Sequence, residues 1–90
     1  MDIKTYASVG SLESNDVYIE LEPNADGEVQ IDIESIVMQQ YGESIREEIQ
    51  SVLDSFGVTS GTVRANDHGA LACVIQARME AAILRSMRQK

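Results

Sequence analysis

The spacing of apolar residues changes at Ser35, and this change limits the folds open to the chain. Before Ser35, the segments Val17–Glu22 and Val29–Glu34 alternate apolar and polar residues, which is the pattern of strands with one buried face. After it, apolar residues recur mostly at steps of three and four, as on one side of a helix. They are Val37, Tyr41, Ile45, Ile49, Val52, Leu53 and Phe56. Strands followed by helices predict an α+β fold.

The other elements follow from shorter patterns. Ile3–Ser11 is expected to be the first strand and Val58–Ala65 a short last strand. A second helix is expected from about Gly69 to Met87, with Asp67 as its N-cap. The order strand, strand, strand, helix, strand, helix predicts two layers, a small antiparallel sheet of about four strands packed against two helices.

Further details of the helices are also expected. The first helix begins either near Ser35, with Gly42 inside it, or at Gly42 after a separate turn, and Gly57 ends it. The second helix is expected to bury a weak apolar stripe. This stripe consists of Leu71, Val74, Ile75, Arg78, Ala82 and Arg85. Cys73 is expected to be a small core residue of the same helix.

Composition indicates one soluble domain spanning residues 1–90. The single cysteine, Cys73, cannot form a disulfide within the chain, so no oxidising compartment is needed. No stretch approaches the roughly 18 apolar residues of a membrane span, and the N-terminus lacks a signal-peptide pattern. A cytoplasmic location is therefore expected.

The net charge of −8 lies in the N-terminal third of the chain. Nine of the fifteen acids fall between Asp2 and Glu34, against one base, Lys4. Such a surface repels phosphate backbones and anionic lipid, so neither nucleic acid nor a membrane is an expected partner. It favours a basic surface on another protein, unless the charge serves solubility alone. Three C-terminal bases suit the negative end of the second helix: Arg85, Arg88 and Lys90.

The sequence offers few groups for catalysis or metal binding. The one histidine, His68, lies in a predicted turn without a second histidine or cysteine at ligand spacing, so no metal site is expected. No nucleophile, histidine and acid stand in a recognisable set, and no glycine-rich phosphate loop occurs. Paired acids on the strands, such as Glu20 with Glu22 and Asp32 with Glu34, are expected to face solvent. The chain is not expected to be an enzyme by itself.

One serine stands out by its position. Val9–Asp16 joins the first two predicted strands, and Ser14 lies there beside Asn15, a residue type that tolerates a left-handed backbone. A serine at the tip of a hairpin is accessible to another enzyme, and its modification leaves the core undisturbed. Glu13 and Asp16 would either orient the Ser14 hydroxyl and accept its proton, or cap the turn. By composition alone, Ser14 is one of nine serines.

The segment around Ser14 resembles a known attachment site. Gly10–Asp16 is similar to the prosthetic-group attachment segment of the citrate lyase acyl carrier protein family, the gamma subunit. Gln40–Arg46 resembles the family's segment of aromatic residue, glycine and acid before the long helix. Val63–Asp67, Gly69–Cys73 and Ala77–Ala81 resemble its last strand and final helix. The resemblance covers nearly the whole chain in one register.

The resemblance implies that Ser14 carries a covalent phosphoribosyl-dephospho-coenzyme A arm, with Glu13, Asn15 and Asp16 flanking it. The thiol of the arm would hold an acetyl group. An alpha subunit (acyl transferase) would exchange acetyl for citryl, and a beta subunit (citryl lyase) would release oxaloacetate and restore the acetyl thioester. The chain would perform no bond chemistry and would carry the acyl group between these sites. A prosthetic-group transferase and an acetate-activating ligase are the other implied partners.

The chain departs from the family pattern at one position, and two alternative interpretations remain. The family often has glycine after the modified serine, where this chain has Asn15, and Asn can adopt the same left-handed turn. No Asp-Ser-Leu motif occurs, and Ser14 precedes a strand, which argues against the four-helix acyl carriers. The malonate decarboxylase carrier subunit uses a related arm on a similar small domain and is the nearest alternative. A protein-interaction domain without a cofactor is the alternative from a different class.

Overall fold

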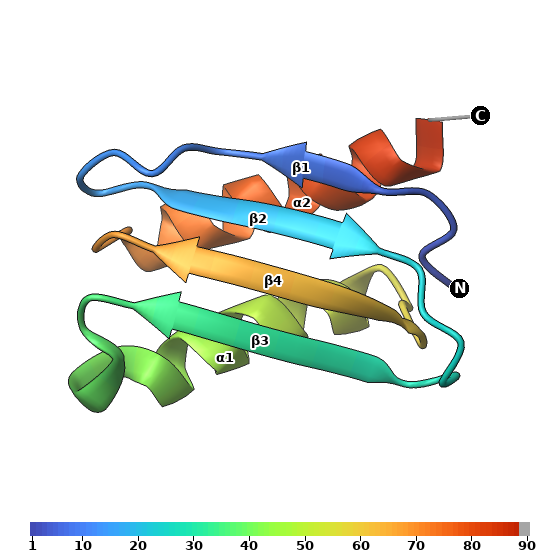
Figure 1. The fold of residues 1–90 in the computed structure, drawn as a ribbon, viewed down its shortest axis with the longest axis horizontal. Helices are drawn as coiled ribbons and strands as arrows, with labels where there is room; N and C mark the ends of the chain where they lie inside the picture. The colour runs from blue at the N-terminus through green and yellow to red at the C-terminus, as the bar shows by residue number, and fades with distance from the viewer. Residues whose placement is uncertain (89–90) are drawn as a thin grey trace.

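The structure, a computed structural model, describes residues 1–88 as one four-stranded sheet with both helices packed on the same face (Figure 1). The elements in chain order are β1 (Ala7–Val9), β2 (Val17–Glu22), β3 (Val29–Ser35), α1 (Met38–Ser55), β4 (Gly61–Asp67) and α2 (Ala72–Arg88). This order and the two-layer α+β class confirm the prediction from the sequence. Lys90 lies outside the described residues.

The sheet is mixed, so the expectation of a wholly antiparallel sheet was wrong. Its strand order is β1-β2-β4-β3, with antiparallel pairing of β1 with β2 and of β2 with β4. β3 pairs parallel with β4, and Val29 lies opposite Gly61. The physical reason is the connection between them, because the 18 residues of α1 carry the chain back along the sheet, as a parallel pair requires.

The core lies between the sheet and the helices. In β2, the alternate residues Val17, Ile19 and Leu21 are fully buried, as their spacing predicted. The helices contribute six residues of low exposure to the same core: Ile45, Ile49 and Leu53 from α1, and Ile75, Met79 and Ile83 from α2. Within residues 1–88, no helix covers the opposite face of the sheet (Figure 1).

The buried stripe of α2 differs from the predicted one. Met79 and Ile83 are fully buried, whereas Leu71 and Arg85 are exposed. Leu71 precedes the helix, and Arg85 reaches out to the carbonyl of Ser8, 2.8 Å away. The prediction that Cys73 is a core residue was also wrong, because it lies on the exposed side of α2.

Several element boundaries also differ. α1 begins at Met38 and contains Gly42, close to the first of the two expected alternatives, and Gly57 follows its end with a φ of +67°. β1 is only three residues long, and β4 extends beyond Ala65 to Asp67.

Asp67 is not the N-cap of the second helix, because α2 starts only at Ala72. Its buried carboxylate accepts hydrogen bonds from the backbone N–H groups of Gly69 and Ala70 and from the Ser35 hydroxyl. Asp67 therefore fixes the connection from β4 to α2. No helix within residues 1–88 combines the length and apolar character needed to span a bilayer.

Candidate functional site

The candidate site is the turn that joins β1 to β2. It occupies residues 10–16 at the end of the sheet where β4 connects to α2 (Figure 1). Ser14 is exposed at its tip. Asn15 has a φ of +65°, so it adopts the left-handed backbone that the sequence predicted for this position. The turn therefore presents the Ser14 hydroxyl to solvent, ahead of a strand rather than a helix.

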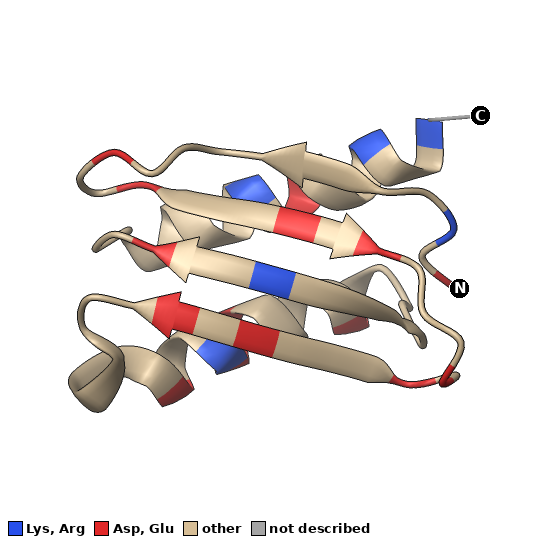
Figure 2. Ribbon diagram, viewed as in Figure 1, with Lys and Arg blue, Asp and Glu red and all other residues tan. Residues whose placement is uncertain are grey.

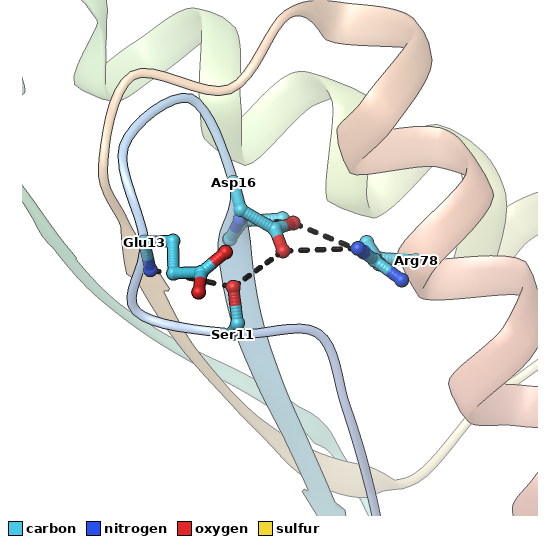
Figure 3. Close-up of polar contacts among 5 residues, drawn as sticks. Ser11, Glu13, Asp16 and Arg78 are labelled. Atoms are coloured by element: carbon cyan, nitrogen blue, oxygen red, sulfur yellow. Dashed lines mark hydrogen bonds and ion pairs between the residues drawn. The ribbon is translucent and has the colours of Figure 1, made fainter.

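Asp16 connects this turn to α2 (Figure 3). Its carboxylate accepts two hydrogen bonds from the Arg78 guanidinium, at 3.0 Å and 2.9 Å. It also accepts one from the Ser11 hydroxyl at 2.7 Å and one from the backbone N–H of Val17 at 2.7 Å. Because four donors surround one carboxylate, both ends of the turn are held to the last helix.

These contacts stabilise the charged form of Asp16. The Arg78 guanidinium is the largest cause and the Ser11 hydroxyl the next, and together they lower the pKa of Asp16 from 3.8 to about 2. The Asp16 side chain is 14% exposed, whereas that of Arg78 is 42% exposed. The pair is therefore a partly solvated ion pair at the base of the turn, and Asp16 is ionised throughout the physiological range.

The backbone of the turn is tied to the end of β4 as well. The N–H of Asn15 donates to the carbonyl of His68 at 2.8 Å, and the N–H of His68 donates to the carbonyl of Asp16 at 2.9 Å. The Nε2 atom of His68 is buried and has no hydrogen-bond partner within residues 1–88. The turn is thus held from two directions, by a strand end and by a helix.

Gly10 permits the chain to enter the turn. Its φ is +88°, and a Cβ atom placed on it would lie 1.9 Å from the carbonyl oxygen of Val17. No residue other than glycine fits such an approach between two backbones without displacement. Gly10 therefore allows the chain that enters the turn to pass close to the backbone of Val17 at the start of β2.

Of the predicted flanking residues, Asp16 caps the turn and is directed at Arg78 rather than at Ser14. Glu13 is exposed, and its backbone N–H donates to the Ser11 hydroxyl at 3.3 Å. Within residues 1–88, neither its carboxylate nor the Ser14 hydroxyl takes part in a hydrogen bond or ion pair. Among the described residues, no side chain is therefore hydrogen-bonded to the Ser14 hydroxyl.

Sequence reasoning assigned no role at this site to Ser11, His68 or Arg78. For Arg78 a signal existed, because a charged residue in a helix stripe that is predicted to be buried needs a partner. For Ser11 and His68 the sequence carried no comparable signal, since their contacts depend on how distant segments meet. Residues 1–88 contain no group of three or more histidine, cysteine or acidic side chains arranged to hold a metal ion.

Comparison with known proteins identifies the family. A family model described as malonate decarboxylase delta subunit, of the acyl carrier type, matches residues 4–86. A citrate lyase acyl carrier protein of Klebsiella pneumoniae is 42% identical over 89 residues, which cover 99% of this chain and 92% of the relative. Another, from Streptococcus uberis, is 48% identical over 86 residues, covering 96% of this chain and 84% of the relative.

The chain belongs to the citrate lyase acyl carrier protein family. A solved structure has a similar fold. One chain of the crystal structure of a Pseudomonas malonate decarboxylase hetero-tetramer in complex with malonate aligns with a TM-score of 0.82 at 21% identity, over 93% of this chain and 86% of that one. At this identity the similarity concerns the fold alone, and it agrees with the mixed sheet and two helices described above.

Proposed function

We propose that the chain is the acyl carrier subunit of citrate lyase and that Ser14 is the attachment point of its phosphoribosyl-dephospho-coenzyme A arm. The relatives' names support the carrier role. The assignment to Ser14 rests on the resemblance of Gly10–Asp16 to the family's attachment segment. The geometry of the turn supports it, because an exposed serine lies at the tip of a firmly held loop. A loop of this kind would hold the attachment point in place and leave the attached arm free to move.

In this proposal the residues of the chain position the arm, and the arm supplies the thiol that carries the acetyl or citryl group. Ser14 would form the phosphodiester. Asp16 lies nearby but is paired with Arg78, which neutralises its charge and reduces repulsion of the anionic phosphodiester. The tether keeps the acyl group at a high effective concentration near the catalytic subunits. The chain itself is proposed to be non-catalytic.

The proposed partners are the alpha and beta subunits of citrate lyase, the prosthetic-group transferase and the acetate-activating ligase, all in the cytoplasm. The uncovered face of the sheet suits a basic partner surface. It carries Glu20 and Glu22 on β2, and Asp32 and Glu34 on β3 (Figure 2). Arg64 of β4 is the one basic residue within the four strands, and it forms an ion pair with Glu22. The remaining excess of negative charge would attract a positively charged surface.

Intact-mass measurement tests the attachment site. Protein made in a host that contains the modifying enzymes should be heavier by one arm, and the Ser14→Ala variant should show the unmodified mass. The matched control is Ser51→Ala, which removes another exposed serine, on α1, and should leave the added mass in place. An unshifted mass for the wild-type protein would refute the carrier proposal and favour a cofactor-free interaction domain.

The carrier subunit of malonate decarboxylase is the second candidate. The fold similarity to a chain of the malonate decarboxylase hetero-tetramer and the description of the matching family model favour it. The sequence identity of 42% to 48% with citrate lyase carriers favours citrate lyase. Assembly of the loaded chain with each set of catalytic subunits, followed by turnover of citrate or malonate, distinguishes the two.

A further inference from the structure

Exposed apolar side chains gather at the end of the molecule that bears Ser14. Within residues 1–88, nine large apolar side chains are exposed, and five of them lie at the end of the sheet that bears Ser14. One is in the turn itself, two are in the β3–α1 and β4–α2 connections, and two are in the first turn of α1. These five form what we call the turn-end patch: Leu12 (58% exposed), Ile36 (70%), Met38 (42%), Tyr41 (54%) and Leu71 (69%). A concentration of this kind on a small acidic protein is typical of an interaction site.

The turn-end patch is continuous with the surroundings of Ser14. The Asn15 Oδ1 atom lies 3.7 Å, and the Ile36 Cδ1 atom 3.9 Å, from the position that a Cβ atom on Gly69 would occupy. Ile36 is fixed there because its N–H donates to the carbonyl of Asp67 at 3.3 Å. Asn15, the neighbour of Ser14, and Ile36, from the β3–α1 connection, therefore both lie beside Gly69.

From Gly69 a groove runs between the first turns of α1 and α2. Its volume is about 530 Å³, and its lining includes Tyr41 and Ile45 of α1, Leu71, and Ile75 of α2. The side chains of Tyr41 and Leu71 are more than half exposed. Apolar surface thus extends from the side of the Ser14 turn into a groove that a partner's side chain can fill.

The position of the patch indicates which protein covers it. The catalytic subunits act on the far end of a long arm and need not touch the base of that arm. The enzyme that attaches the arm acts before any arm is present. Its active site must therefore contact the Ser14 hydroxyl directly. An interface of ordinary size buries about 800 Å² on each partner, an area extending roughly 16 Å in every direction from its centre. An interface centred on Ser14 therefore covers the neighbouring connections.

We propose that the turn-end patch is the docking surface for the enzyme that modifies Ser14, and that this enzyme surrounds its active site with a complementary apolar surface. The proposal rests on the proposed function of Ser14 as the attachment point. In the reaction served by this docking, the Ser14 Oγ forms a bond to the phosphorus atom that carries the arm in the donor. The phosphoanhydride bond from this phosphorus to the donor's phosphate leaving group breaks, the leaving group takes the electron pair of that bond, and the Ser14 proton passes to a base of the enzyme.

The test compares two double variants that each remove two exposed apolar side chains. Ile36→Ser/Leu71→Ser alters the turn-end patch, and Leu84→Ser/Met87→Ser alters the far end of α2, where the side chains are 43% and 58% exposed. Initial rates of Ser14 modification by the prosthetic-group transferase are followed by intact mass. We expect kcat/KM to fall at least about tenfold for the first variant, mainly through KM, and to stay within about twofold for the control.

A conservative variant guards against a change in folding. Ile36→Val/Leu71→Met keeps the surface apolar, so it should restore most of the rate, and urea unfolding should give nearly equal stabilities for all variants. Equal modification rates for the wild-type protein and Ile36→Ser/Leu71→Ser would overturn the proposal. The proposal would also be overturned if the wild-type chain formed a dimer that Ile36→Ser/Leu71→Ser dissociates, because the patch would then bind a second copy of the chain. A wild-type chain that is never modified would instead refute the role of Ser14 itself.

Discussion

Replacing Asp16 by asparagine tests whether the pair with Arg78 holds the Ser14 turn. Asparagine has nearly the same volume but no charge, so it weakens the hydrogen bonds that the carboxylate accepts from Arg78 and Ser11. The expected result is a less stable protein with a more mobile turn. The magnitude follows from the pKa of Asp16 and the exposure of Arg78.

The lowered pKa sets an upper limit on the stabilisation. The difference between 3.8 and about 2 corresponds to at most about 2.5 kcal/mol, at about 1.4 kcal/mol per pH unit. Because the Arg78 side chain is 42% exposed, solvent screens the interaction, and we expect Asp16→Asn to lower the free energy of unfolding by about 1–2 kcal/mol at pH 7. In a domain of this size this corresponds to a melting temperature lower by roughly 5–15 °C.

The pH dependence provides the decisive measurement. The pKa of Asp16 is lower in the folded than in the unfolded state, so its stabilisation is complete well above 3.8 and is lost as the pH falls toward about 2. In urea unfolding, the difference between the wild-type protein and Asp16→Asn should therefore shrink over this range. The control Glu47→Gln, at an exposed acid on α1, should show a difference near zero throughout. Equal stabilities of the wild-type protein and Asp16→Asn at pH 7, or a difference that persists at pH 2, would refute the reasoning.

Three further predictions concern the turn and the open face of the sheet. Gly10→Ala should destabilise the protein by about 3 kcal/mol or more in thermal unfolding, because its Cβ would overlap the Val17 carbonyl oxygen; an unchanged melting temperature would contradict this. Asn15→Ala should cost about 1 kcal/mol and Asn15→Gly almost nothing in the same assay, because φ is positive; equal losses would argue against backbone strain. Glu20→Lys/Glu22→Lys should slow association with the catalytic subunits, and stopped-flow rates should depend less on salt than those of the wild-type protein. Unaltered rates and salt dependence would exclude electrostatic steering.

The sequence predicted the elements that local patterns specify. The alternation in β2 identified its buried face, and the stripe through Ile49 identified the buried side of α1. The left-handed conformation of Asn15 was predicted because short loops between strands require it. Each of these depends on neighbouring residues only, so a single sequence contains the information.

What depends on the meeting of distant segments was not predicted. The parallel pairing of β3 with β4 follows from where α1 returns the chain, which the spacing of residues does not specify. Cys73 was assigned to the wrong side of α2 because a helix of mixed composition has no clear apolar face. The contacts that Arg78 and His68 make with the turn were also missed, because they depend on how α2 and β4 come to lie beside it.

The ion pair between Asp16 and Arg78 also has a consequence for when, relative to synthesis and folding, Ser14 can be modified. The two residues are 62 positions apart, and Arg78 lies in α2, which is synthesised after the turn. While the chain is still growing, the turn around Ser14 has neither its ion pair nor the neighbouring α2. An enzyme that recognises the assembled end of the molecule would therefore disregard incomplete and unfolded chains. Attachment of the arm would then mark a carrier in which α2 has been synthesised and has packed beside the turn.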